Sequence, residues 1–314
     1  MMLRQLFTPS RRWRQAALPA LAQRASSPGN EAWRRLRRNR PAMTSLALLL
    51  LMVLWCAVGP YFSPWRDDAT DIMMINKAPD AAHWLGTDFL GRDIYTRMLL
   101  AGRISLTIGL VTMLLSVTLG YAVGAVAGYA GGLTDKLLMR LADLLMTIPS
   151  LPLLIIMGAV VTELGIPPDY RIYLVMVMLS LLGWPSLARL VRGQILSLRE
   201  RDFMLATEVL GLSARRRILG HLLPNTVPIL IVVATLGVAN AILSESALSY
   251  LGLGVVPPTP SWGNMMDAAN SLIDFQRRPW LWMPPGAAIF LTVVAINLLG
   301  DALRDALDPH MTRR

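Results

Sequence analysis

The chain has 314 residues, of which 54% are hydrophobic and only 16% are charged, a composition too apolar for an ordinary soluble domain. Its formal net charge of +10 could suggest a nucleic-acid partner, but ten Arg against the single Glu31 within residues 1–40 supply most of that charge. A basic stretch directly before an apolar segment is typical of a cytoplasmic flank that faces anionic membrane lipid, so no nucleic-acid binding is expected.

Residues 1–40 are therefore predicted to form a basic cytoplasmic tail, and residues 41–314 a transmembrane domain. Backbone amides have no water to bond in hydrocarbon, so long charge-free runs predict closed helices and an all-α integral membrane fold. Most of the runs reach the roughly 17–25 residues that a spanning helix needs. Six such spans are predicted, at residues 41–65, 104–134, 144–162, 172–188, 222–244 and 279–300.

The distribution of basic residues predicts the orientation of these spans. With the N-terminus inside, 22 of the 30 Lys and Arg lie in the cytoplasmic segments, as the positive-inside rule requires, so both termini are predicted to be cytoplasmic. Two long outer loops follow, at residues 62–103 and 245–283. In the first, Gly86-Thr87-Asp88 and Gly91-Arg92-Asp93 predict tight turns, because Gly adopts positive φ and Asp accepts hydrogen bonds from nearby amides.

Residues inside the spans suggest helix packing and a possible translocation path. Gly120, Gly124 and Gly128 recur at four-residue spacing, which permits close helix approach in a membrane. Trp184 lies beside Pro185, a residue that disturbs a regular helix, and Glu245 closes the fifth span with no neighbouring cation in sequence. Trp184 and Glu245 are our candidates for the translocation path, although structural pairing is the simpler account of a charge near a span end.

The segment 201–225, between the fourth and fifth spans, is neither apolar enough to span nor polar enough for a plain loop. On a helix its apolar residues form two adjacent stripes, followed by an arginine cluster, and such an amphipathic element either docks on a partner or lies on lipid headgroups. The stripes are Leu205, Val209 and Leu212, and Phe203, Ala206 and Leu210; the cluster is Arg215, Arg216 and Arg217.

Signatures of catalysis and of metal binding are missing from the sequence. The only lysines, Lys77 and Lys136, do not follow glycine, which excludes a P-loop ATPase. The three histidines lie far apart without a zinc-protease motif, and Cys56 is the single cysteine. We therefore expect no enzymatic activity, no metal site and no cofactor in this chain.

The 201–225 segment resembles the cytoplasmic loop of permease subunits of bacterial ABC importers, which carries a Glu-Ala-Ala motif, a later Gly and a Leu-Pro. Leu205-Ala206-Thr207, Gly211 and Leu223-Pro224-Asn225 occupy these positions, with Leu205 in place of the usual Glu and Thr207 in place of the second Ala. The resemblance implies a type I permease fold whose coupling helix contacts an ATPase subunit. The contact residues that it implies are Phe203, Leu205, Ala206, Thr207, Gly211, Arg215 and Pro224.

Further stretches resemble the dipeptide, oligopeptide and nickel branch of that family, and within it the C-type permease, over about residues 30–310. They include residues 83–93, 184–193, 248–263 and 299–309. This resemblance implies a bacterial inner-membrane importer in which the chain pairs with a B-type permease, two subunits that bind ATP and Mg²⁺, and a solute-binding protein. Peptide is the expected cargo; nickel, glutathione or another small solute is the alternative, and a channel or carrier independent of ATP is the alternative from a different class.

Overall fold

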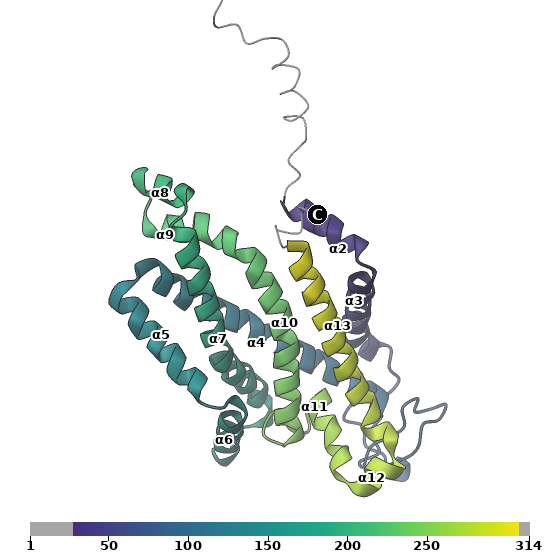
Figure 1. Cartoon of the computed structure of the whole chain (residues 1–314). Helices are drawn as coiled ribbons and strands as arrows, with labels where there is room; N and C mark the ends of the chain where they lie inside the picture. Colours follow the sequence, from purple (N-terminus) through teal and green to yellow (C-terminus); the bar gives the residue numbers. More distant parts are fainter. Residues whose placement is uncertain (1–27, 308–314) are drawn as a thin grey trace, which may run out of the picture.

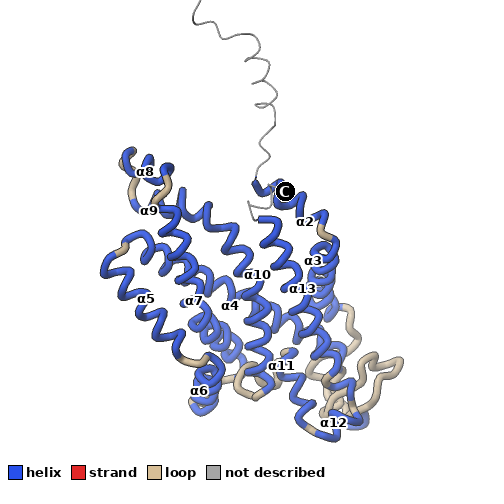
Figure 2. Tube along the Cα trace, viewed as in Figure 1, coloured by secondary structure: helices blue, strands red, loops and turns tan. Residues whose placement is uncertain are grey.

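The computed structural model describes residues 28–307, so most of the predicted tail, and the C-terminal end of the 299–309 stretch, lie outside the described residues. The described chain is a bundle of helices that run between two ends (Figures 1 and 2). α2 (Pro28–Arg38) and α8 (Asp202–Val209) lie at one end, and α6 (Ser150–Glu163) and α12 (Leu272–Arg277) lie at the other. We name these the α8 end and the α12 end.

Within residues 28–307, five helices are long and apolar enough to cross a membrane, and α5 (Gly132–Thr147) with α6 makes a sixth crossing when taken together. The prediction of an all-α membrane protein with six spans is thus confirmed. The five uninterrupted helices are α3 (Arg40–Val58), α4 (Ile94–Ala130), α7 (Pro168–Arg199), α10 (Leu223–Tyr250) and α13 (Met283–Leu307).

The third crossing, predicted as one helix over 144–162, is broken. α5 and α6 meet at an angle of 83°. The break falls at Ile148, whose backbone is extended with ψ 124°, because the ring of the following Pro149 disfavours a helical conformation at the residue before it. α5 also begins earlier than predicted, directly after Gly131 ends α4 with φ +67°.

Two loop boundaries differ from the sequence prediction, since α4 begins at Ile94 and α10 continues to Tyr250. The outer loops therefore cover residues 62–93 and 251–282. Asp93 starts α4 by accepting a hydrogen bond from the amide of Thr96, which satisfies one of the free amides of the first turn. The charge-free criterion missed residues 94–103 because Arg97 and Arg103 lie inside the helix, where Arg103 Nε donates to the carbonyl of Cys56 at 2.8 Å.

α4 packs against α7 along the predicted glycine face. A Cβ at Gly120 would lie 2.6 Å from the Leu187 Cβ, and one at Gly124 only 2.4 Å from the Ala188 carbonyl oxygen. Neither distance leaves room for a side chain, so the two backbones approach as closely as their own atoms allow. Close helix packing, which the sequence predicted for these glycines, is confirmed.

Shorter elements complete the two ends. At the α8 end, α9 (Ala214–Arg217) continues through the π-helical turn η3 (Ile218–Leu222) directly into α10, and Leu36 of α2 packs against Ala302 and Ala306 of α13. The α12 end contains η1 (Gly59–Tyr61), η2 (Ile72–Met74), α11 (Trp262–Met265), η4 (Met266–Asn270) and η5 (Pro279–Leu281).

Candidate functional site

α8 protrudes from its end of the bundle (Figure 1) and exposes large apolar side chains. Val209 is 88% exposed, Leu210 76% and Leu205 53%. Apolar side chains on the spanning helices are exposed too, but α8 lies beyond those helices at one end of the bundle, so its apolar patch is a candidate contact with a partner or with lipid headgroups. We call the exposed set the α8 surface: Phe203, Leu205, Ala206, Val209 and Leu210.

The opposite face of α8 holds the helix on the bundle. Met204 is buried in a cluster with Ile195 and Leu198 of α7 and Leu222 of η3. Thr207 is buried as well, and its hydroxyl donates to the Met204 carbonyl at 2.7 Å, so this predicted contact residue faces the chain's own helices. The two apolar stripes predicted from the sequence did not include Met204. Its spacing of three residues from Thr207 could have indicated that these two residues share one face of the helix.

Gly211 ends α8 in a Schellman motif. Its φ is +70°, its amide donates to the Glu208 carbonyl at 2.9 Å, and the amide of Leu212 donates to the Thr207 carbonyl at 3.1 Å. Other residues seldom adopt this left-handed conformation, so glycine is required here for the backbone itself. A Cβ at Gly211 would meet nothing within 4 Å, so its own chain leaves this position open.

Arg217 connects α8 with two membrane-spanning helices. Its Nη1 lies 3.4 Å from Glu208 Oε2 of α8, and its guanidinium lies 5.4 Å from the ring centre of Tyr129, at the end of α4. Since α9 continues into α10, this single side chain joins α8, α4 and α10. Of the remaining predicted contact residues, Arg215 and Pro224 are both exposed, and Pro224 lies in the first turn of α10.

A cavity of about 380 Å³ lies among α4, α6, α7 and α10. Its wall mixes aliphatic groups with six small polar side chains, a lining suited to a polar solute that is held weakly. The polar residues are Thr112, Ser116, Ser150, Ser186, Asn240 and Ser244. No periodic pattern marks these residues in the sequence, because serine and threonine are also common at ordinary helix contacts.

The two predicted path residues do not line this cavity. Trp184 is 5% exposed and packs against Ala142 of α5 and Ala188 of its own helix. Glu245 has no exposed surface. Contact between either side chain and a passing solute would require the helices around it to separate, so both assignments remain predictions.

Glu245 instead joins α10 to α4 and to the following loop. Ser105 of α4 donates to its carboxylate at 3.0 Å, and Ser249 donates at 2.7 Å. The same two hydroxyls accept from the amides of Trp262, at 3.2 Å, and Val255, at 2.9 Å. One buried carboxylate thus organises a network that fixes the start of α11, as expected where polar groups are fully satisfied in a protein interior.

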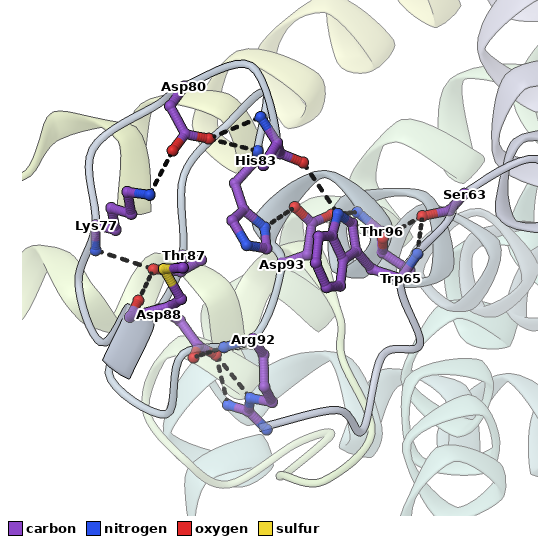
Figure 3. A network of polar contacts seen from close by, with 12 residues as sticks. Ser63, Trp65, Lys77, Asp80, His83, Thr87, Asp88, Arg92, Asp93 and Thr96 are labelled. Atoms are coloured by element: carbon purple, nitrogen blue, oxygen red, sulfur yellow. Dashed lines mark hydrogen bonds and ion pairs between the residues drawn. The ribbon is translucent and has the colours of Figure 1, made fainter. Parts of the chain in front are cut away.

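The outer loop 62–93 carries a dense polar network (Figure 3). Asp88 accepts from the amides of Leu90 at 2.8 Å and Arg92 at 3.0 Å, and from Arg92 Nε at 2.7 Å. Gly86 and Gly91 have φ of +74° and +73°. The predicted turns, with positive φ at glycine and amides bonded by aspartate, are confirmed.

The second half of the network is centred on His83. Its Nδ1 lies 2.9 Å from Asp93 Oδ1, and its ring stacks on Trp65 at 4.4 Å. The Lys77 ammonium and the His83 amide lower the pKa of Asp80 to about 2, so this carboxylate stays ionised and keeps the turn closed at any ordinary pH. These contacts make the loop a rigid platform at the α12 end.

Within residues 28–307, no group of three or more His, Cys, Asp or Glu side chains is arranged to hold a metal ion. His310 lies outside the described residues.

Comparison with known proteins adds to this picture. Residues 120–313 match the family described as the binding-protein-dependent transport system inner membrane component, and residues 27–79 match the N-terminal transmembrane domain of oligopeptide transport permease C. The chain is 37% identical over 293 residues to the oligopeptide transport system permease protein OppC of Bacillus subtilis, covering 93% of each chain.

Two further relatives are also peptide permease proteins. The dipeptide transport system permease protein DppC of Bacillus subtilis is 40% identical over 283 residues, which cover 90% of this chain and 86% of the relative. The oligopeptide transport system permease protein OppC of Haemophilus influenzae is 39% identical over 281 residues, covering 89% and 88%. With its membrane-spanning helices and its short exposed α8, the chain belongs to the family of inner membrane components of binding-protein-dependent transport systems.

Proposed function

We propose that this chain is the C-type permease subunit of an ATP-driven peptide importer and forms half of its translocation pore. The observation that carries the proposal is the α8 surface, an apolar face on a short helix that projects from one end of a membrane-spanning bundle. The names of the relatives, which are oligopeptide and dipeptide permeases, support peptide as the cargo.

The α8 surface is the proposed contact with a separate ATP-binding subunit, which would hold ATP and Mg²⁺. Large exposed side chains such as Val209 and Leu210 would enter the partner, and Arg215 and Pro224 would border the contact. Thr207 would act from beneath, because it is buried on the face of α8 that packs on the bundle. Two such subunits would drive the two halves of the pore.

The rigid loop at the α12 end is the proposed platform for the solute-binding protein. A docking surface must keep its shape while the bundle moves, and the hydrogen bonds around Asp88 and Asp93 supply that rigidity. The basic segments of the sequence favour an arrangement with the α8 end in the cytoplasm and the α12 end outside the bacterial inner membrane.

The cavity among α4, α6, α7 and α10 is the proposed path through this half, and a B-type permease would close it from the other side. Closure of the ATP-binding subunits would move α8, and rocking of the two permease halves would open the path to either side of the membrane in turn. The small polar side chains of the cavity wall support a hydrated path.

Purification of the tagged chain from its native membrane tests the proposal. A second permease and ATP-binding subunits should copurify, and a binding protein loaded with peptide should stimulate their ATPase activity. Stimulation by nickel or glutathione, but not by peptide, would reassign the cargo. A chain that purifies alone and conducts solute without ATP would make it a channel or carrier.

A further inference from the structure

A second, charged groove lies next to the proposed path, on the face shared by α5 and α7. It encloses about 750 Å³ and carries both signs of charge. Its charged residues are Asp135, Lys136, Arg140, Asp143, Arg189 and Arg192.

One stripe of α7 connects this groove with the serine-lined cavity. Leu182, Ser186, Arg189 and Gly193 follow one another at spacings of four, three and four residues, which places them on one side of a helix. Leu182 and Ser186 line the cavity, and Arg189 lines the groove. Gly193 continues the stripe into open space, since a Cβ there would meet nothing within 4 Å.

The third crossing, α5 with α6, also connects the charged groove with the serine-lined cavity. Asp143 of α5 borders the groove, and Ser150, just beyond the break, borders the cavity. Arg189 directly follows the charge-free run of α7, on the side of α8. Charged groups of both signs beside a serine-lined cavity belong to a face turned toward water or protein, because exposure to acyl chains is costly.

The two ion pairs of the groove differ in exposure. Arg192 binds Asp135 through two bonds, one of them 2.6 Å from Nη2 to Oδ2, and these side chains are 33% and 15% exposed. Arg189 binds Asp143 through one nitrogen, and both side chains are about half exposed. Both pairs join α5 to α7, but only the second leaves a guanidinium and a carboxylate about half exposed in the groove.

From this geometry we infer that Arg189 and Asp143, which contact each other, form a binding site for the two charged ends of a short peptide such as a dipeptide on its way out of the pore. Arg189 would donate to the terminal carboxylate, a group that guanidinium binds well, and Asp143 would accept from the terminal ammonium. Each end of the zwitterion exchanges water for a fixed opposite charge, and the ion pair re-forms when the peptide leaves. The inference rests on the proposed function and adds the residues that recognise the cargo.

Reconstituted transport tests the inference. The complete complex, with its partner subunits and binding protein, is placed in liposomes, and uptake of one peptide is compared with that of its C-terminal amide. The sequence of the peptide is chosen so that both forms, once bound, stimulate the wild-type ATPase equally. Arg189→Gln should lower uptake of the free carboxylate about tenfold and of the amide less than about twofold.

Arg140→Gln is the matched control, because it removes the same charge from the same groove without touching the pair; it should leave the ratio of the two uptake rates unchanged. Asp143→Asn tests the other end, and should slow a peptide with a free ammonium more than its N-acetyl form. If Arg189→Gln fails to assemble with its partners, Asp143→Asn is sufficient to test the inference.

The inference is wrong if Arg189→Gln affects both peptide forms alike, as a purely structural pair or a lipid headgroup site would require, or if Arg140→Gln gives the same selectivity. Failure of the proposed function looks different, because the wild-type complex would then import neither form.

Discussion

At the scale of single residues, the backbone conformation explains why glycine stands at position 211. Gly211 lies in the resemblance motif of a partner contact, yet the structure gives it a role inside its own chain, at φ +70° in the Schellman motif of α8. A glycine that serves a partner and a glycine that ends a helix look the same in sequence. The two roles are compatible, since the motif also sets where α8 ends.

Gly211→Ala should destabilise the last turn of α8 by about 1 kcal/mol, because alanine must adopt a left-handed conformation. Hydrogen exchange at the amides of Leu210 and Leu212 should become about fivefold faster. Gly220→Ala is the control, as it lies in a helical turn with open space around it. Equal exchange rates in both variants would contradict the Schellman assignment.

At the scale of helices, the contacts that hold α8 are few. Met204 supplies the buried contact, and Arg217 supplies the polar one through Glu208 and Tyr129. Glu208 is 67% exposed, so its ion pair with Arg217 contributes little by itself. The stacking of the guanidinium on Tyr129 adds a further contribution of the cation–π type.

Arg217→Met should loosen α8 from α4 and α10 while the aliphatic stem remains. We expect faster hydrogen exchange throughout Asp202–Val209 and at least a twofold fall in the solute transported per ATP hydrolysed. Arg216→Met, at an exposed neighbouring position, should leave both quantities unchanged. An unchanged transport ratio in Arg217→Met would show that α8 moves its helices by another route.

At the scale of the whole molecule, Glu245 holds the α12 end together. Glu245→Leu removes the acceptor shared by Ser105 and Ser249 and leaves two buried hydroxyl donors without an acceptor, at a cost of about 2–4 kcal/mol. A lower melting temperature and faster proteolysis of residues 251–282 should follow. Glu245→Gln keeps an oxygen acceptor, so its loss of stability should be less than half that of Glu245→Leu. Equal losses of stability in the two variants would mean that the hydrogen-bond network does not hold the loop in place.

Much of this architecture follows from the sequence, because lipid imposes a simple rule on every spanning segment. Charge-free runs located the five uninterrupted spanning helices and the α6 half of the bent third crossing, and the glycine face and the turns of the outer loop were also predictable. The rule failed where a charge is satisfied inside the protein, as at Arg103 in α4 and Glu245 in α10. It could not foresee the cavity, whose serines come from four helices that are distant in sequence.

The continuous helix from Ala214 to Tyr250 has a mechanical consequence. It contains 37 residues, a length of about 55 Å at the usual rise per residue. A tilt of about 6° about one end would displace the other sideways by about 6 Å, roughly half the diameter of a helix. A small rotation at the α8 end therefore becomes a sideways shift of several ångström at Tyr250, where α10 meets the loop that leads to α11.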